Sequence, residues 1–380
     1  MSWFAITATL LLRFWPVWLC LALTLLVSRR YRKRLGLYGK LMGSSVGVAG
    51  LIFVLFWVFT ALFGDMIATF DPLAQLSGMK NKPPGTLLPD GMGVYLLGGD
   101  NLARDVFSRT VLGARQVLSI APLATLFAFM VGITLGLPAG YISGKLDTFL
   151  SFLANLVLAF PVILLFYLLV TPEIAQSRIP TTMAGVLFLF PLIFFTIIIN
   201  SRYWTDPPRR NMILGIGLLV GFWLYLGLAF NADPLGLVSM PSNILIVFVS
   251  VVFVNAPTVY RIVRGLTMDI KTRDYVAAAQ TRGERPWYIM LWEILPNARG
   301  PLIVDFCLRI GYVTILLGTL GFFGLGVSPE SPDWGSTIND GRKLLSQYPW
   351  PAVVPALSLM SLVLGLNLLA DGLREESLRD

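Results

Sequence analysis

Apolar runs of about 20 residues recur along this chain, and they restrict what it can fold into. A helix needs about 20 apolar residues to cross a hydrocarbon core of about 30 Å, and in lipid only helices and closed barrels satisfy their backbone groups. Only 13% of the residues are charged and 56% are hydrophobic, whereas soluble domains are about a quarter charged. We therefore expect an all-α, polytopic membrane protein with nine spans, at about residues 3–27, 44–64, 117–138, 148–170, 182–200, 212–230, 243–262, 301–323 and 351–371.

The basic residues predict which side of the membrane each loop occupies. With nine spans, the loops on one side, together with the span ends that adjoin them, hold 19 Lys and Arg and those on the other hold 8, whereas each side holds 10 acidic residues. An asymmetry confined to the cations is typical of the positive-inside effect, so we expect the N-terminus outside and the C-terminus in the cytoplasm. The net charge of +8 therefore indicates membrane orientation rather than nucleic-acid binding.

The first apolar run has two readings. It resembles a signal peptide in position, but its basic cluster, Arg29 to Arg34, comes after the run, and a signal peptide carries its charge before it. We therefore expect a first span with a cytoplasmic segment behind it, residues 1–43. Arg13 lies alone in this span, where a phospholipid contact, another subunit or a wrongly placed span would explain it.

Two segments predicted to lie outside the cytoplasm are too long to be simple turns. Residues 65–116 contain Pro83-Pro84-Gly85, which is typical of irregular loop, and Asp100 is placed where it could cap a short helix. Residues 324–350 end at Tyr348-Pro349-Trp350, and aromatic residues of this kind favour the membrane interface.

One cytoplasmic stretch, from Asp274 to Asn297, is too polar to cross a bilayer. Three alanines precede Gly283, where a helix could end with positive φ, and Pro286 suits the first turn of a second helix. The pattern predicts two short helices joined by an elbow. The small side chains of the first helix would let the groove of another protein approach its backbone.

Two further patterns lie within the spans. Gly132, Gly136, Gly140 and Gly144 recur every fourth residue, which predicts a smooth stripe for close packing, inside the bundle or against a partner subunit, with Pro138 bending or ending the helix. Asp305 and Arg309 lie four residues apart on one helical face, so we expect an ion pair there, either structural or lining a pathway.

The sequence contains few residues or motifs that would support catalysis. The chain has no histidine, and Cys20 and Cys307 both lie in apolar runs, so zinc sites and disulfide frameworks are not predicted. Gly140 to Lys145 is one residue short of a phosphate loop and lacks its Ser or Thr. No metalloprotease or nucleophile-elbow motif is present, so any ATP hydrolysis is expected on another chain.

The polar stretch resembles the EAA loop of the permease subunits of bacterial ABC importers, through Ala277-Ala278-Ala279, Gly283 and Leu295-Pro296. Further motifs resemble the C-type subunit of dipeptide and oligopeptide importers. They are Arg104 to Arg109 before Gly113-Ala114-Arg115, Ala159-Phe160-Pro161, Asp274-Tyr275-Val276, Gly321 to Val327, Pro332-Asp333-Trp334-Gly335 and Asn367 to Arg374. The chain departs from the family pattern at Ala277 (Glu in the family), Glu293 (often His) and Ala103 (Gly).

The resemblance implies a type I importer core of six spans, with the first span and a pair near 182–230 as additions. This divides the chain into residues 1–43, a first core span with its outer loop at 44–116, and a permease domain at 117–380 with the EAA loop at 269–297. It implies a homologous permease, two cytoplasmic ATPase subunits that bind ATP and Mg, and an extracytoplasmic solute-binding protein as partners. The residues implied to couple to the ATPase are Arg273, Asp274, Tyr275, Ala277, Ala278, Ala279, Gln280, Thr281, Arg282 and Gly283.

The alternatives differ in class. The elbow could be an ordinary loop of another transporter, and a secondary transporter working alone would show inverted repeats and midplane charges. An intramembrane enzyme would show catalytic motifs. The order of several motifs favours the importer permease, which carries no catalytic site itself. The sequence leaves open whether the substrate is a peptide, a nickel chelate, an opine or a sugar-like solute.

Overall fold

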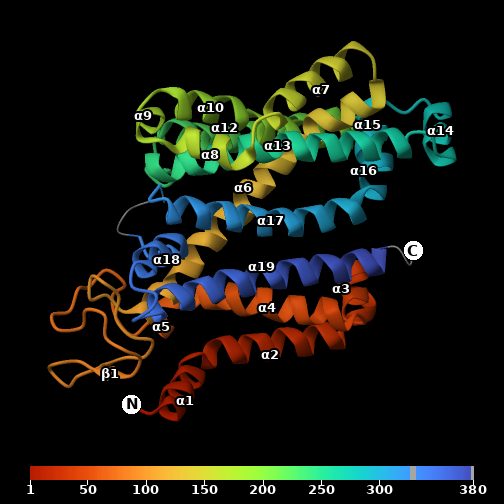
Figure 1. Cartoon of the computed structure of the whole chain (residues 1–380). Coiled ribbons are helices and arrows are strands. Elements are labelled where there is room, and N and C mark those ends of the chain that lie inside the picture. The colour runs from red at the N-terminus through yellow and green to blue at the C-terminus, as the bar shows by residue number, and fades with distance from the viewer. Residues whose placement is uncertain (326–330, 378–380) are drawn as a thin grey trace. The chain divides into compact units, whose positions relative to one another are not determined.

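The structure, a computed structural model, describes residues 1–325 and 331–377, and the chain divides into two units. The first unit comprises residues 1–122 and 303–380. Its elements are α1 (Trp3–Arg13), α2 (Trp15–Arg30), η1 (Arg32–Arg34), α3 (Gly36–Leu41), α4 (Ser45–Leu62), α5 (Gly64–Ile67), β1 (Thr86–Leu87), β2 (Val94–Tyr95), the start of α6 (Val106–Ile142), most of α17 (Arg299–Phe322), α18 (Trp334–Arg342) and α19 (Trp350–Ser377) (Figure 1).

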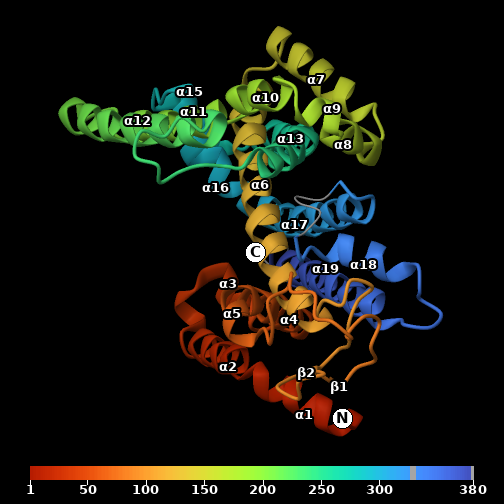
Figure 2. The same cartoon turned by 90° about the vertical axis from the view of Figure 1, so that its left-hand side faces the viewer.

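The second unit comprises residues 123–302. Besides the rest of α6 it holds α7 (Lys145–Leu158), α8 (Val162–Val170), α9 (Pro172–Ala175), α10 (Ile179–Leu187), α11 (Leu189–Arg202), α12 (Pro207–Phe230), α13 (Ser242–Ile270), α14 (Asp274–Thr281), α15 (Pro286–Tyr288), the π-helical η2 (Ile289–Ile294) and α16 (Leu295–Asn297). Helices α11 and α12 lie side by side (Figure 2).

The all-α prediction of about nine spans is confirmed. Seven helices of the described chain are long and apolar enough to cross a membrane, with α10 and α11 counted as one, and two bent helix pairs bring the number to nine. The only strands among the described residues form the β1–β2 hairpin, in which Thr86 pairs with Tyr95 and Leu87 with Val94. The fold therefore follows from the length of the apolar runs.

Two predicted spans are bent rather than straight. The first breaks at Phe14, where α1 and α2 meet at 55°. Arg13 is the last residue of α1 and is exposed, so it lies at the break and not in the middle of a continuous span. The span expected at 148–170 bends by 80° between α7 and α8, at Ala159-Phe160-Pro161, where the pyrrolidine ring disfavours helical continuation.

The helix expected at 117–138 is longer than predicted. It begins at Val106 and ends at Ile142, so the end of the predicted outer loop is helical and Pro138 does not end the helix. Asp100 does not cap it; its carboxylate accepts from the backbone N–H groups of Leu102 and Arg104 in a loop. Asp105 takes that position, because its Oδ2 accepts from the backbone N–H of Ser108 at 3.0 Å.

Close packing at glycines joins pairs of helices within each unit. In the first unit, a Cβ on Gly50 of α4 would lie 2.2 Å from the backbone nitrogen of Leu369 in α19. In the second, Cβ atoms on Gly132, Gly136 and Gly140 would lie within 2.9 Å of α13. The predicted glycine stripe therefore packs α6 on α13 inside the chain, whereas Gly144 lies beyond α6, at the N-cap of α7.

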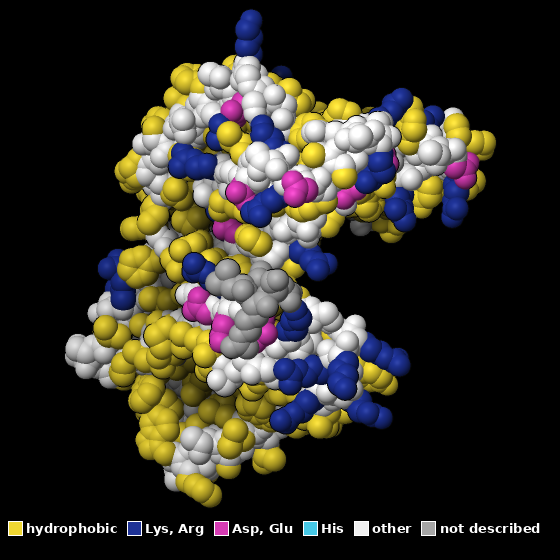
Figure 3. Space-filling model, turned by 90° about the vertical axis from the view of Figure 1, so that its right-hand side faces the viewer, with side chains coloured by type: hydrophobic (Ala, Val, Ile, Leu, Met, Phe, Trp, Pro, Cys, Tyr) yellow, Lys and Arg dark blue, Asp and Glu magenta, His cyan; other side chains and the backbone are white. Residues whose placement is uncertain are grey.

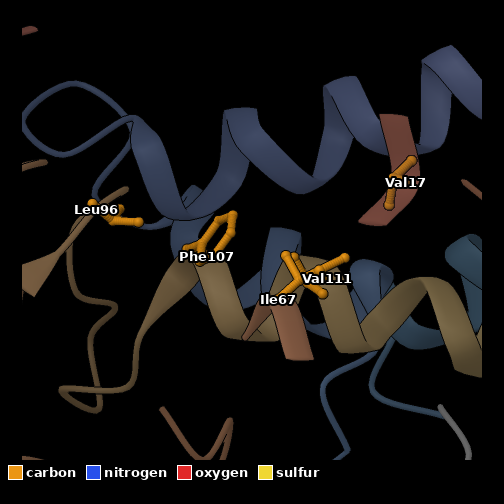
Figure 4. Packing of buried hydrophobic residues seen from close by; sticks show 5 residues of the cluster. All are labelled: Val17, Ile67, Leu96, Phe107 and Val111. Atoms are coloured by element: carbon orange, nitrogen blue, oxygen red, sulfur yellow. The ribbon is translucent and has the colours of Figure 1, made fainter. Parts of the chain in front are cut away.

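A cluster of buried apolar side chains anchors the start of α6 in the first unit. Val17, Ile67, Leu96, Phe107 and Val111 come from α2, α5, the residue after β2 and α6, and each is at most 3% exposed (Figure 4). Where such side chains are removed from water, burial stabilises by about 1.5–3 kcal/mol each. The hairpin segment and the start of α6 are therefore parts of one core.

Candidate functional site

The predicted elbow is present at the end of α13. Helix α14 ends at Thr281, and Gly283 follows with φ of 78°. The Gly283 N–H donates to Gln280 O at 2.9 Å and the Glu284 N–H donates to Ala279 O at 3.2 Å. This pair of bonds is the Schellman arrangement, in which the residue after the helix adopts a left-handed conformation. Pro286 then begins the second helix, as predicted.

Helix α14 buries one narrow face and exposes the rest. Val276 and Ala279 are fully buried, and α14 packs against η2. Of the ten residues predicted to couple, Ala279 therefore points inward and belongs to this packing. The other nine, from Arg273 to Gly283, are exposed. Ala277 and Ala278 present methyl groups only, so the backbone of this face is open to close approach.

The second helix of the elbow runs through α15, η2 and α16. It is buried on one side and contains a π-helical turn. Ile289, Met290, Leu291 and Ile294 are at most 5% exposed, and they lie in η2, whose turn is π-helical. A wide turn next to proline relieves the clash between the Pro296 ring and the carbonyl four residues earlier. The Leu295-Pro296 motif is thus accommodated inside one helix.

Glu293, a departure from the family pattern, has a partner across the elbow. The Arg282 guanidinium donates to its carboxylate at 2.9 Å, and Glu284 lies 3.8 Å from the same guanidinium. Arg282 is about half exposed, so the pair contributes at most about 1 kcal/mol. It links the end of α14 to the second helix, and an acidic residue at position 293 is therefore consistent with the elbow.

The sequence did not predict the contacts that join the elbow to α6 and α7. Lys271 Nζ donates to Gly140 O and Ser143 Oγ, both at 2.8 Å. The Arg264 guanidinium binds both carboxylate oxygens of Asp147. Spacing could not reveal these pairs, since the partners are more than 110 residues apart. The base of the elbow is therefore tied to two neighbouring helices.

Another group of motif residues is buried in the first unit. Arg104 is 3% exposed and binds Asp100 at 2.6 Å and Asp340 at 2.8 Å. Arg109 is fully buried and donates to Thr337 Oγ1 and to the backbone oxygens of Pro72 and Ser331. The two motifs around residues 104–109 and 332–335 therefore meet in space. Two carboxylates pair with Arg104, whereas Arg109 donates to neutral oxygens.

Trp334 and Asp333 complete this buried group. The Trp334 Nε1 donates to Thr110 O at 2.8 Å, and the side chain is fully buried. Asp333 caps α18 by accepting from the N–H groups of Gly335 and Ser336. Burial raises the pKa of the Asp333 carboxyl and of the Asp105 carboxyl, although hydrogen bonds from neighbouring residues act in the opposite direction.

Glycines in these motifs make room for the buried group. A Cβ on Gly321 would lie 2.2 Å from Asp333 Oδ2, and one on Gly113 would lie 2.4 Å from Pro332 O. Ala103, where the family has glycine, adopts φ of 63°, a conformation that costs L-residues about 1–2 kcal/mol. Two residues of the Gly321 to Val327 motif, Gly326 and Val327, lie outside the described residues.

The predicted pair in α17 is formed. Arg309 Nε lies 2.7 Å from Asp305 Oδ2, and the two side chains are 8% and 18% exposed. Two hydrogen bonds join them, which suits a structural pair. A role in the pathway stays a prediction.

Comparison with known proteins finds two matching family models and relatives that align with most of the chain. Residues 211–375 match the binding-protein-dependent transport system inner membrane component, and residues 40–84 match the N-terminal transmembrane domain of oligopeptide transport permease C. Three relatives illustrate the range. The dipeptide transport system permease protein DppC of Alkalihalophilus pseudofirmus is 28% identical over 89% of this chain and 87% of its own. The di/tripeptide permease protein DppC of Pseudomonas aeruginosa is 29% identical over 86% of each. The glutathione transport system permease protein GsiD of Pectobacterium atrosepticum is 28% identical over 87% and 85%.

Proposed function

Because the chain belongs to the permease subunits of ABC importers, among the binding-protein-dependent transport system inner membrane components, we propose that it forms half of a pathway for peptides or similar small solutes. The other half would be a homologous permease. Two cytoplasmic ATPase subunits would drive the pathway, and an extracytoplasmic binding protein would deliver the solute. The named relatives transport dipeptides, tripeptides and glutathione, which favours short peptides.

The proposal that α14 couples this chain to an ATPase is based on the exposed face of that helix. It offers open backbone at Ala277 and Ala278 beside the polar side chains of Arg273, Asp274 and Gln280, while its buried face rests on η2. A cleft in the ATPase would hold α14, and differential contacts in two ATPase states would shift it. The contacts of Lys271 and Arg264 at its base support transmission of that shift to α6 and α7.

The orientation proposed from the basic residues fits this role. With the N-terminus outside and the C-terminus inside, residues 269–297 lie in the cytoplasm, where an ATPase would meet them. We propose that residues 1–43 and the span pair near 182–230 add to a core of six spans. On the face seen in Figure 3, Lys and Arg side chains lie in groups beside hydrophobic ones, as expected near a membrane boundary.

Isolation of the assembly tests the proposal. Tagged full chain is purified from the membranes of its own host in mild detergent, and we expect a second permease and an ATPase to be isolated with it. Ala277→Trp, on the exposed face of α14, should release the ATPase and leave the second permease bound. Ser177→Trp, on an exposed loop of the second unit, is the matched control. Solute uptake into liposomes by this polypeptide alone would refute the proposal.

A further inference from the structure

The connection between α11 and α12 rests on the second helix of the elbow. Trp292 Nε1 donates to Ser201 Oγ at 2.9 Å, and the Arg202 guanidinium lies 5.0 Å from the centre of the Trp292 ring. Arg285 lies 3.4 Å from the centre of the Trp204 ring. These cation–π contacts join the two segments, so the span pair near 182–230 touches the elbow through this connection.

A pocket of about 630 Å³ opens at this junction. It receives side chains from both segments, and its lining combines guanidinium groups with aromatic rings. The residues that matter here are Arg202, Trp204, Thr205, Arg285, Trp287 and Tyr288.

The pocket lining carries two guanidinium groups and one carboxylate, so its formal charge is positive. Among the described residues, neither Arg202 nor Arg285 takes part in an ion pair, and the one acidic lining residue, Glu284, lies beside Arg282 instead. Arg210 lies 4.9 Å from the Trp204 ring, which therefore has two guanidinium groups near it. A phosphate bound beside these guanidinium groups would supply the anionic partner that they lack.

An apolar pocket of about 510 Å³ lies against α6 and α11, which also line the charged pocket. It takes Phe127 and Met130 from α6 and Phe195 and Ile199 from α11. The charged pocket takes Ile142 from α6 and Arg202 from α11, so it lies further along both helices. An apolar pocket followed by a basic one matches an amphiphile with a hydrocarbon chain and an anionic head. Helices α10 to α12 are the least buried of the candidate spans, which suits contact with lipid.

We propose that this junction binds the phosphate headgroup of an anionic phospholipid, with an acyl chain in the apolar pocket. The assignment to the cytoplasmic leaflet rests on the orientation in the proposed function. Anionic lipids in that leaflet attract basic residues, and Trp favours the interface. A headgroup held here contacts both the α11–α12 connection and the second helix of the elbow.

Native mass spectrometry of the purified full chain in detergent tests the proposal one lipid at a time. Phosphatidylglycerol is compared with phosphatidylcholine of the same acyl chains. We expect phosphatidylglycerol to bind at least about 10-fold more tightly, and Arg202→Gln with Arg285→Gln to weaken it about 30-fold, since each basic residue near an anionic headgroup contributes about a factor of five. Phosphatidylcholine binding should not change.

Two further variants keep the result specific. Lys80→Gln with Lys82→Gln removes the same charge from exposed residues of the 65–116 loop, which the proposed orientation places outside the cytoplasm, and should leave the lipid affinity unchanged. Arg202→Lys with Arg285→Lys keeps the charge and should retain most of the binding, which separates loss of charge from loss of folding. Equal affinity for both lipids, an equal loss in the Lys80 and Lys82 control, or displacement of the lipid by inorganic phosphate would overturn the proposal. The measurement needs neither an ATPase nor transport, so its outcome is independent of the isolation experiment.

Discussion

Two regions of this chain carry motifs of the same family and use them in opposite ways. Around residues 104–109 and 332–335 the motif side chains are buried, and Arg104, Arg109 and Trp334 all find partners within the first unit. Along α14 the motif side chains are exposed, and nine of the ten predicted coupling residues face solvent. One group therefore maintains the fold, and the other is free to contact a partner.

Glycine has a different role in each of the two regions. Gly283 at the elbow adopts positive φ in open space, where a Cβ would meet nothing within 4 Å. Glycines at 113, 321 and 335 make room for buried atoms instead. Conformational freedom matters at the elbow and the absence of a side chain matters in the buried group, and substitution separates the two effects.

The largest effect is expected from Trp334→Ala. Removing a fully buried tryptophan, together with its bond to Thr110 O, should cost about 3–5 kcal/mol, which would lower the yield of folded protein and its apparent melting temperature in detergent. Tyr275→Ala on α14, 39% exposed, is the matched control and should change stability by about 0.5 kcal/mol or less. Similar losses for both would remove the distinction between the regions.

Gly283→Val should leave the permease folded but impair coupling. A β-branched residue at φ of 78° costs about 1–2 kcal/mol, so the equilibrium constant for forming the wild-type elbow should fall about 5- to 30-fold. Solute transported per ATP hydrolysed by the assembled importer should fall accordingly. Asn, which tolerates this conformation, should restore much of the ratio. A ratio equal to that of wild type in Gly283→Val would exclude the role of the elbow.

Ala103→Gly tests the left-handed position in the buried region. The substitution removes strain of about 1–2 kcal/mol and adds about 0.5–1 kcal/mol of unfolded-state entropy. The net result should be a gain of about 1.5 kcal/mol or less, seen as a higher apparent melting temperature with unchanged coupling. A decrease in melting temperature would show that the methyl group of Ala103 contributes packing that outweighs the strain.

Asp105→Asn should have the smallest effect at neutral pH and should change its pH dependence. Burial raises the pKa of Asp105 in the folded protein, so protonation favours folding, and the contribution of Asp105 to stability falls as pH rises through that pKa. The melting temperature of wild type relative to Asp105→Asn should therefore rise as pH is lowered from 7 toward 4. A constant difference across this range would contradict a buried, titrating Asp105.

The spans and the elbow could be predicted because both depend on local chemistry. The length of each apolar run predicts a helix, and Gly283 and Pro286 predict where one helix ends and the next begins. The bend at Ala159-Phe160-Pro161 carries a proline signal that the prediction of a straight span did not use. The start of α6 at Val106 was missed because polar residues at its first turns resemble a loop.

The contacts within the site could not be predicted in the same way. Lys271 with Gly140, Arg264 with Asp147, and Trp292 with Ser201 join residues at least 91 apart in sequence, and no period or motif records such a pairing. The burial of Ala279 was missed because Ala277, Ala278 and Ala279 look alike in sequence. The turn of the helix alone decides which methyl group faces η2.

The length of α6 has a consequence for where its charges lie. At 1.5 Å per residue its 37 residues extend about 55 Å, whereas hydrocarbon occupies about 30 Å. Even a strongly tilted helix of this length leaves several turns in the headgroup region or in water. The first turns, which carry Arg109 and Thr110, can therefore lie outside the hydrocarbon layer. A hydropathy profile that counts α6 as a single crossing omits these turns.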